Sequence, residues 1–468
     1  MLILAFLCFS NFVFTQQSVT LMTYNLLKFS ENSSDRLPCF KTVLDSLQPD
    51  ILIVQEIFSQ GAIDLFHSNA LDTSYQKGIF IDGPDSDNGV FYKHDRFTFV
   101  SNTPIPTALR NISEFKLVFQ PTGDTLRIYS VHLKASSGSA SETQRLQEVM
   151  ALRNITNSLP AGSNFVVCGD FNMYKSSEPA YQALIYNNQE SEGHFIDPIS
   201  LTGTWNKAEH ARFHTQSTRT RQFGGGASGG LDDRFDMILF SSAIEQPGGV
   251  HYMPNSTWAV GNDGFHYNDS VNKQPNSSVS QVLADALHCA SDHLPVIARF
   301  FFGGTVINLS VSLEEGWNSI STFFEPYNTE IPFIVAPLGA NFIALHDIEG
   351  LVYPEGGTNS IENWNYHLGY ALKVSESATL IIQGYLPDNA WVQINEGWNM
   401  IPVLSDSAKQ IEDVFGQNLV HVEMIKEVAG TNVFWPAMGI FSLEYLNPKA
   451  AYYLKSSRVF TADFQSVK

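Results

Sequence analysis

The chain has 468 residues, of which 44% are hydrophobic and 16% are charged, and this balance excludes an intrinsically disordered protein. Its formal net charge of −20 excludes long-range attraction to a polyanion as the basis of binding. The length allows about two or three domains, each with a core of its own.

Residues 1–17 begin with an apolar stretch, MLILAFLCFSNFVF, that is too short to span a bilayer comfortably. Its length suits the apolar segment of a secretory signal peptide, although no Lys or Arg precedes it. We therefore expect a signal peptide over residues 1–17 and a secreted or cell-surface protein. A buried N-terminal strand is the alternative. No later stretch is long and apolar enough for a transmembrane helix.

The cysteines do not form a disulfide framework. Removal of a signal peptide would take Cys8 with it and leave Cys39, Cys168 and Cys289. Cys168 lies in an apolar, strand-like run and is expected to be buried. One bridge between Cys39 and Cys289 is compatible with the sequence, but nothing in the sequence supports it.

Polar residues stand at the ends of several strand-like segments between residues 18 and 303. Four segments end in them: SVTLMTYN at Asn25, DILIVQE at Glu56, LRIYSVH at His132, and FVVCGDFN at Asp170 and Asn172. Two later segments begin with them: DMILFS at Asp236, and SDHLPVIARF at Asp292 and His293. If the later two strands run antiparallel to the earlier four, all these polar groups gather at one edge of the fold.

Such a gathering predicts chemistry on a phosphate ester. The carboxylates of Glu56, Asp170 and Asp292 repel one another unless a cation or a proton intervenes. Oxygen-rich sites with amide support suit Mg²⁺ best here, with Mn²⁺ or Ca²⁺ as alternatives, and do not suit zinc. A hard cation offsets phosphoryl charge, while one base activates water and another group protonates the leaving oxygen. No zinc-protease, serine-hydrolase or phosphate-loop motif occurs in the sequence.

Two further segments of this region have local interpretations. Residues 141–158 predict a helix that begins with a capping box of Ser141 and Gln144 and buries Leu146, Val149 and Met150 on one face. Residues 254–278 are rich in Asn, Ser and Gly and predict a long surface loop, in which His266 is expected to be solvated.

Residues 212–236 carry positive charge in an acidic chain. Four arginines lie in this segment around the run GGGASGG: Arg212, Arg219, Arg221 and Arg234. One interpretation is a loop that faces the substrate, in which the arginines hold phosphate groups. The alternative is an ordinary exposed, flexible loop. The first is favoured because the loop leads directly into Asp236.

The composition changes after Gly303 and Gly304. Only seven Lys or Arg follow, against 18 Asp or Glu, so this part has a net charge of −11. LEEGWNSIS (313–321) recurs as INEGWNMIP (394–402), and GYALKVSESATL (369–380) is echoed by AYYLKSSRVFTA (451–462). We predict two β-rich repeats, 304–386 and 387–468, which resemble modules appended to secreted bacterial enzymes. Their ligand is left open.

The ordered set TYN, QE, VHL, GDFN, RFD and SDHLP resembles the endonuclease/exonuclease/phosphatase superfamily, whose members include deoxyribonuclease I. The resemblance covers residues 18–303 and rests most on GDFN and SDHLP. It implies a four-layer α/β sandwich in which two central mixed sheets are flanked by helices. It also implies that Glu56 is the main metal ligand, assisted by Asn25 and Asp292.

The same resemblance implies catalytic roles for five residues. Asp170 would orient or deprotonate the attacking water, and Asn172 would hold the phosphate. His293, paired with Asp236, would stabilise the phosphoryl transition state or act as a base. His132 would contact the phosphate or protonate the leaving group.

The expected function is that of a secreted, metal-dependent phosphodiesterase or endonuclease acting on extracellular nucleic acid. A sphingomyelinase-like lipid phosphodiesterase and a catalytically vestigial surface binding protein are the alternatives. The exonuclease III branch has an acidic residue where this chain has Leu27, and it tends to lack a histidine equivalent to His132. The resemblance is therefore strongest to the deoxyribonuclease I, sphingomyelinase and phosphoinositide branches.

Overall fold

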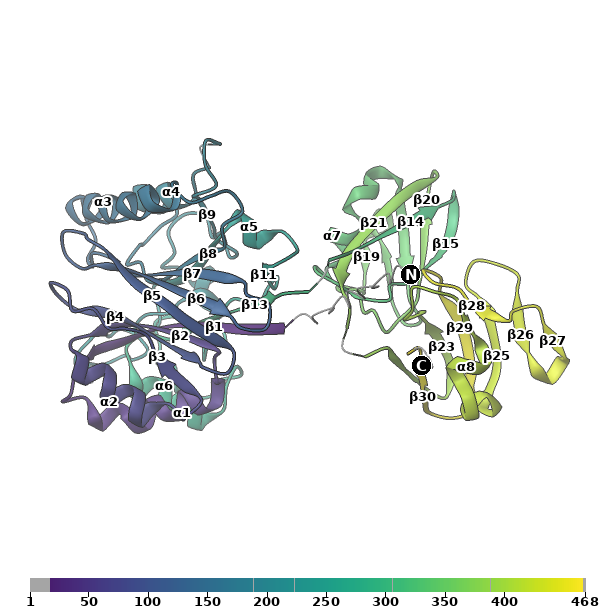
Figure 1. Cartoon of the computed structure of the whole chain (residues 1–468), viewed down its shortest axis with the longest axis horizontal. Helices are drawn as coiled ribbons and strands as arrows, with labels where there is room; N and C mark the ends of the chain where they lie inside the picture. The colour runs from purple at the N-terminus through teal and green to yellow at the C-terminus, as the bar shows by residue number, and fades with distance from the viewer. Residues whose placement is uncertain (1–16, 188, 223, 305, 388, 466–468) are drawn as a thin grey trace, which may run out of the picture. The chain divides into compact units, whose positions relative to one another are not determined.

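The computed structural model describes residues 17–187, 189–222, 224–304, 306–387 and 389–465 (Figure 1). The predicted signal peptide therefore lies outside the described residues, apart from Gln17. The described chain divides into two compact units, and the division falls at the Gly303–Gly304 pair. None of the described helices is long and apolar enough to cross a bilayer.

The first unit, Gln17–Gly303, contains two central sheets. In one, the strand order is β11-β13-β1-β2-β4-β3, and β12 also pairs with β13; in the other it is β5-β6-β7-β8-β10-β9. The first sheet has the bounds β1 Gln17–Phe29, β2 Ile51–Ile57, β3 Tyr75–Lys77, β4 Asp87–Lys93, β11 Val250–Tyr252, β12 Trp258–Ala259 and β13 Val296–Phe302. The second has the bounds β5 Phe97–Ile105, β6 Ile112–Phe119, β7 Thr125–His132, β8 Phe165–Asp170, β9 Phe195–Ile196 and β10 Asp236–Ser241.

Helices cover the outer face of each sheet and complete four layers (Figure 1). The first sheet is covered by α1 (Leu37–Leu47), α2 (Gln60–Ala70) and α6 (Gln281–Ala290), and the second by α3 (Ser139–Thr156) and α4 (Pro179–Ile185); a short α5 is Ser242–Glu245. Strand alternation explains the apolar run of β2, because Ile51 and Ile53 pack between the sheets while Leu52 packs toward the helices. The predicted four-layer α/β sandwich is confirmed.

The structure corrects one local prediction in this unit and decides another that the sequence left open. Helix α3 begins at Ser139 after Gly138, so the capping box predicted at Ser141 does not form, and Met150 is exposed. Cys39 of α1 and Cys289 of α6 form a disulfide, which the sequence alone did not support. Cys168 is buried with a free thiol, as expected.

The second unit consists of small antiparallel sheets, as predicted for a β-rich tandem repeat. The first repeat contains β14 Ile307–Leu313, β15 Gly316–Ile320, β16 Glu325–Pro326, α7 Ile331–Val335, β17 Phe342–His346, β18 Leu351–Tyr353, β19 Thr358–Asn359, β20 Tyr370–Val374 and β21 Ala378–Tyr385. The second contains β22 Trp391–Ile394, β23 Gly397–Ile401, β24 Lys409–Gln410, α8 Ile411–Phe415, β25 Val422–Glu427, β26 Val433–Trp435, β27 Ile440–Phe441, β28 Tyr445–Leu446, β29 Tyr452–Ser456 and β30 Phe460–Asp463. The five-stranded sheets β15-β20-β17-β18-β19 and β23-β29-β25-β26-β27 have matching strand orders.

Candidate active site

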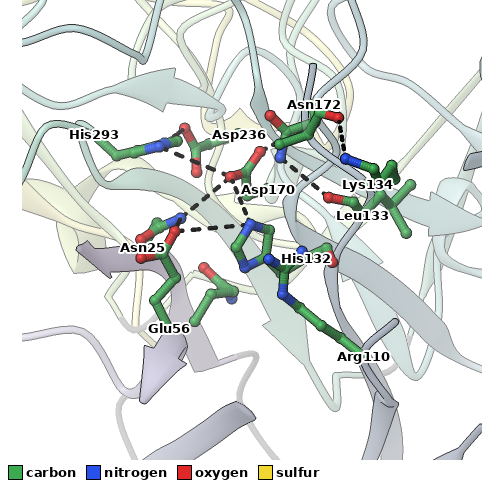
Figure 2. A network of polar contacts seen from close by, with 12 residues as sticks. Asn25, Glu56, Arg110, His132, Leu133, Lys134, Asp170, Asn172, Asp236 and His293 are labelled. Atoms are coloured by element: carbon green, nitrogen blue, oxygen red, sulfur yellow. Dashed lines mark hydrogen bonds and ion pairs between the residues drawn. The ribbon is translucent and has the colours of Figure 1, made fainter. Parts of the chain in front are cut away.

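The strand directions bring the predicted polar residues to one edge of the first unit (Figure 2). β7 and β8 are parallel, whereas β10 and β13 run antiparallel to their neighbours β8 and β1, as the sequence required. In the β7–β8 register His132 lies opposite Asp170. Gly169 makes this pairing possible, because its φ is +131° and a Cβ there would lie 2.1 Å from the carbonyl oxygen of Val131.

Asp170 lies at the centre of the site, between two histidines (Figure 2). Its Oδ2 is 3.6 Å from His132 Nε2 and 3.8 Å from His293 Nε2. The side-chain amide of Asn25 donates to the same oxygen at 3.2 Å. Burial raises the pKa of Asp170 to about 7, opposed by the nearby His293 and supported by the charges of Asp236 and Glu56.

Glu56 reaches the site through irregular backbone. The β1–β2 and β2–β4 pairings both shift register around it, and its own φ is +62°. Such a bulge re-aims a side chain, and left-handed backbone at a non-glycine residue is typical of functional sites. Glu56 Oε1 lies 3.7 Å from His132 Nε2 and accepts a hydrogen bond from Asn25 Nδ2 at 3.1 Å. The N–H of Lys28 donates to Oε2 at 2.7 Å.

His293 is held by a carboxylate on one side. Its Nδ1 lies 2.7 Å from Asp236 Oδ2, and its Nε2 lies 3.3 Å from Gln216 Nε2 and faces Asp170. All three of His293, Asp236 and Asp170 are buried. The structure therefore brings together the predicted His293–Asp236 pair, and His293 Nε2 faces Asp170.

The two histidines differ in their electrostatics. Burial alone lowers the pKa of His293, but the carboxylates of Asp236 and Asp170 outweigh it and hold that pKa well above its usual value. Burial also lowers the pKa of His132, and the positive charge of Arg110 lowers it further, so it lies well below its usual value. At neutral pH His293 is therefore cationic and His132 is neutral, which does not suit His132 as a proton donor.

The donor set fits a divalent cation. Donor atoms of Glu56, His132 and Asp170 all lie within 4.8 Å of one another. Asp292 Oδ1 is buried and has no hydrogen-bond partner among the described residues, which also suits a cation ligand. Asn25 Oδ1 accepts from the N–H of Leu27 at 2.9 Å, and its Nδ2 faces the two carboxylates. The ligand role of Asn25 stays a prediction.

Asn172 lies at the site but is already engaged. Its N–H donates to Asp170 Oδ1 at 3.1 Å, and its Nδ2 donates to the carbonyl of Leu133 at 3.2 Å. Its φ of +51° is again left-handed, which Asn tolerates better than most residues. The side chain thus orients the turn after β8, and phosphate binding by Asn172 stays a prediction.

The four predicted phosphate-binding arginines separate into two kinds. Arg234 is buried in a two-pronged ion pair with Asp197, with nitrogen–oxygen distances of 2.8 and 2.9 Å. Arg219 is buried and donates to the backbone carbonyls of His288 and Cys289. Neither guanidinium is available to substrate, so both predictions were wrong. Arg212 and Arg221 are exposed, and their role stays a prediction.

The glycine-rich run in residues 212–236 contacts a carboxylate instead of presenting arginines. The N–H of Ala227 donates to Asp292 Oδ2 at 2.6 Å. A Cβ on Gly226 would lie 2.6 Å from the same oxygen, and Gly226 has a φ of +83°. Only glycine allows this close approach, so the run holds one oxygen of Asp292 and leaves the other free.

Sequence reasoning missed two residues of the site. Arg110 lies in the connection between β5 and β6; its Nε is 2.9 Å from Asp85, and its Nη1 donates to the carbonyl of His132 at 3.4 Å (Figure 2). Gln216 contacts His293. Both lie outside the motif set, and only the pairing of distant segments shows where they are.

His266 is buried rather than solvated. Its Nδ1 lies 2.7 Å from Asp263 and its Nε2 lies 2.7 Å from the carbonyl of Lys273, so the ring ties together the loop of residues 254–278. This corrects the sequence-based expectation for that residue.

The fold and the paired carboxylates and histidines at its edge define the class of protein as a hydrolase of phosphoric esters. The model of the Endonuclease/Exonuclease/phosphatase family matches residues 22–293, more than half of the chain. The chain belongs to this family. Members typically use a divalent metal, and Glu56, His132 and Asp170 form the candidate site for it here.

Solved structures with a similar fold include a humanised D. rerio TDP2 carrying 14 mutations, which is 17% identical, has a TM-score of 0.41 and is aligned over 60% of this chain and 98% of that chain. The catalytic domain of human Nocturnin with bound sulfate is 19% identical (TM-score 0.37; 61% and 94% covered). A mannosyl-6-phosphatase of Bacteroides thetaiotaomicron is 18% identical (TM-score 0.39; 61% and 100% covered). Among curated proteins no match is found.

Proposed function

We propose that this protein is a secreted, divalent-metal-dependent phosphodiesterase that hydrolyses nucleic acid. The observation that carries the proposal is the placement of Asp170 between two histidines whose pKa values are shifted in opposite directions. A cationic and a neutral imidazole can have different roles in one reaction, because the cation stabilises developing negative charge and the neutral ring can ligate a metal. Hydrolysis of a phosphodiester needs such charge stabilisation together with a base that accepts a proton from the attacking water.

Three residues of the site have different roles in this reaction. Asp170, with a pKa near neutrality, accepts a hydrogen bond from the attacking water and orients it. Cationic His293, held by Asp236, donates from Nε2 to a phosphoryl oxygen and stabilises the charge that develops there. Neutral His132 contributes as a ligand or as a contact to the phosphate.

A divalent cation fits the carboxylate edge. Glu56, Asp170 and His132 would hold it. The predicted ligand Asp292 is not in this group, although its Oδ1 has no hydrogen-bond partner among the described residues. When bound, the cation supplies Lewis-acid charge that offsets the negative charge of the phosphoryl group. Without a cation, three carboxylates at one edge repel one another.

The disulfide supports secretion. Cys39 and Cys289 are 250 residues apart in sequence and join α1 to α6. Disulfides persist mainly in oxidising compartments outside the cytosol. This agrees with the apolar N-terminal stretch of the sequence. Mass spectrometry of the secreted protein under non-reducing conditions would test whether the Cys39–Cys289 bridge is present in it.

Nucleic acid is the first candidate substrate because Arg212 and Arg221 are exposed in the segment that leads into Asp236. With Arg219 and Arg234 buried, few cations are left to contact the backbone. We therefore expect only about two to four phosphate contacts and a correspondingly shallow dependence of binding on salt.

A lipid phosphodiester is the second candidate, and two exposed aromatic side chains favour it. Phe265 is 84% exposed, and Trp258, just before it in the chain, is 38% exposed. Together with Phe213 they line a shallow pocket of the first unit. Aromatic side chains in such positions suit contact with a membrane interface.

One assay separates these candidates. The purified protein is incubated with duplex DNA, single-stranded RNA, sphingomyelin vesicles, bis(p-nitrophenyl) phosphate and p-nitrophenyl phosphate, each with Mg²⁺ and with excess EDTA. We expect metal-dependent cleavage of nucleic acid and of the diester, and slower release from the monoester. Hydrolysis confined to sphingomyelin would replace the nuclease proposal with the lipid one. No turnover of any substrate would indicate a vestigial site, and turnover unchanged by EDTA would contradict the metal.

A further inference from the structure

The second unit repeats one short motif, Gly-Trp-Asn, and two of its three residues have a clear structural task. Gly316 and Gly397 have φ values of +99° and +91°. Asn318 accepts from the N–H of Glu314 and donates to its carbonyl, and Asn399 makes the same pair of bonds with Asn395. The glycine and the asparagine therefore close the same turn in both repeats.

The tryptophan between them has no such task. Trp317 and Trp398 are each 47% exposed, although tryptophan is among the most costly side chains to leave in water. Each lies on the first strand of a five-stranded sheet and faces a lysine on the next strand, Lys373 and Lys455 respectively. Two copies that differ in most other positions thus keep an exposed indole beside a lysine.

Other polar and aromatic groups lie on the same faces. His346 packs against Trp317 with ring centroids 5.3 Å apart, and Lys373 Nζ lies 5.7 Å above the Trp317 ring. Tyr453 packs against Trp398 at 6.5 Å, and Lys426 Nζ lies 5.3 Å above the Tyr453 ring. We call these surfaces the Trp317 face and the Trp398 face. Three of the seven basic residues after Gly303 lie on them, in a unit with a net charge of −11.

The two repeats contact each other directly. The N–H of Ser321 donates to the carbonyl of Lys449, and the N–H of Gly369 donates to the carbonyl of Met400, both at 2.9 Å. With the offsets of 81 and 82 residues, exchanging the repeats brings each contact to within two residues of the other, with the donor and acceptor segments reversed. Corresponding segments of the two repeats therefore meet, as in an approximate two-fold interface between like halves. Both repeats belong to one compact unit, so the two faces have a fixed spacing.

We propose that the Trp317 face and the Trp398 face are two binding sites for a polysaccharide of neutral sugars. The flat indole matches the C–H face of a sugar ring. Lys373 and His346 on the Trp317 face can donate to sugar hydroxyl groups. On the Trp398 face Lys426 can do so, whereas Lys455 is paired with Glu423 at 2.9 Å. Two like sites match a ligand that repeats along its length, and together they gain avidity. The charge of −11 opposes a polyanion, which favours a neutral polymer. The inference is independent of the substrate of the catalytic unit.

The alternative is that the Trp–Lys pairs only stabilise the sheets, as cross-strand pairs do by up to about 1 kcal/mol. The two explanations predict different effects of replacing the tryptophans on stability and on ligand binding. Under the alternative, replacing them lowers the unfolding temperature and affects no ligand. Under the proposal, replacing them removes binding whether or not the unfolding temperature moves.

The test is affinity electrophoresis of the full chain in native gels that contain laminarin, galactomannan, pullulan or hydroxyethylcellulose. We expect at least one polymer to retard the protein. Trp317→Ala and Trp398→Ala should each weaken retardation on the order of tenfold, and the double variant should migrate as in a gel without polymer. Trp391→Ala is the matched control, because Trp391 is 43% exposed in the same unit but lies on a different sheet.

Trp317→Phe and Trp398→Phe keep an aromatic face and should retain most of the binding, which covers the case in which the alanine variants do not fold. Retardation by none of the four polymers would overturn the proposal, as would a folded double variant that is still retarded. A gel with single-stranded DNA is run in parallel. If DNA retards the protein and the double variant abolishes this, the faces bind nucleic acid and the polysaccharide proposal falls.

Discussion

Asp236 acts through another residue, because its carboxylate raises the pKa of His293 and orients the ring. A group with a raised pKa is protonated below that pKa and loses its proton as the pH rises through it. Activity that needs cationic His293 should therefore fall on the alkaline side. In Asp236→Asn this fall should move to lower pH, because the supporting charge is gone.

The measurement is kcat/KM against pH with bis(p-nitrophenyl) phosphate, and turnover at the optimum should also drop on the order of 10²–10⁴. Asp45→Asn serves as the control, since Asp45 lies in an exposed pair with Lys41. If the alkaline fall in kcat/KM occurs at the same pH in Asp236→Asn as in the wild type, His293 does not act as a cation.

The Asp197–Arg234 pair should matter for stability and not for substrate binding. Burial alone would raise the pKa of Asp197, but Arg234 outweighs it and holds that pKa below its usual value. Stability from such a group is present above the unfolded pKa, about 4, and is lost as the pH falls through the folded pKa. Asp197→Asn should cost about 3–5 kcal/mol, because it leaves a buried guanidinium uncompensated.

Urea unfolding at pH 7 and at pH 3 measures this effect. The difference in unfolding free energy between the wild type and Asp197→Asn should shrink at pH 3, because the carboxylate of the unfolded chain is then protonated and the wild type loses part of this stabilisation. Asp45→Asn should change stability by less than about 1 kcal/mol at either pH, as expected for an exposed pair. An Asp197→Asn protein of full stability would contradict the pair's structural role.

At the scale of elements, the pairing of β7 with β8 sets the distance between His132 and Asp170. Gly169→Ala should disrupt it, because the new Cβ would meet the backbone of Val131 and cannot be accommodated by a side-chain movement. We expect loss of activity greater than tenfold together with reduced thermal stability. Gly162→Ala is the matched control, since Gly162 also has a positive φ but open space around it. Equal behaviour of the two variants in thermal unfolding and in diester hydrolysis would show that the close approach is not needed.

At the scale of the whole molecule, residues 18–303 should fold and catalyse on their own. Every residue of the candidate site lies in this segment, and the segment contains its own three hydrophobic clusters. The truncated protein should show cooperative unfolding and a kcat on bis(p-nitrophenyl) phosphate within about twofold of the full chain. A well-folded but inactive truncation would mean that the repeats contribute to the site, and the division into domains would have to be redrawn.

Much of this protein was determined by its sequence alone. Apolar runs that stop at Glu56 and Asp170 predict buried strands with carboxylates at their ends. The reason is that apolar side chains favour the core, whereas carboxylates favour its edge. The offset of 81 residues between the Gly-Trp-Asn motifs predicts the tandem repeat, and the order of the motifs implied the four-layer fold through its resemblance to a known family. These features are local or periodic, so they can be found without knowing which segments meet.

Only the tertiary structure decided which charges face substrate and which are buried. Arg234 and Arg221 are alike as residue types, yet one pairs with Asp197 inside the fold and the other is exposed. The same holds for the Cys39–Cys289 disulfide and for Asn25, which faces two carboxylates from other strands. The physical reason is that burial, pairing and pKa depend on partners that are distant in sequence, and those partners are fixed only when the sheets and helices pack together.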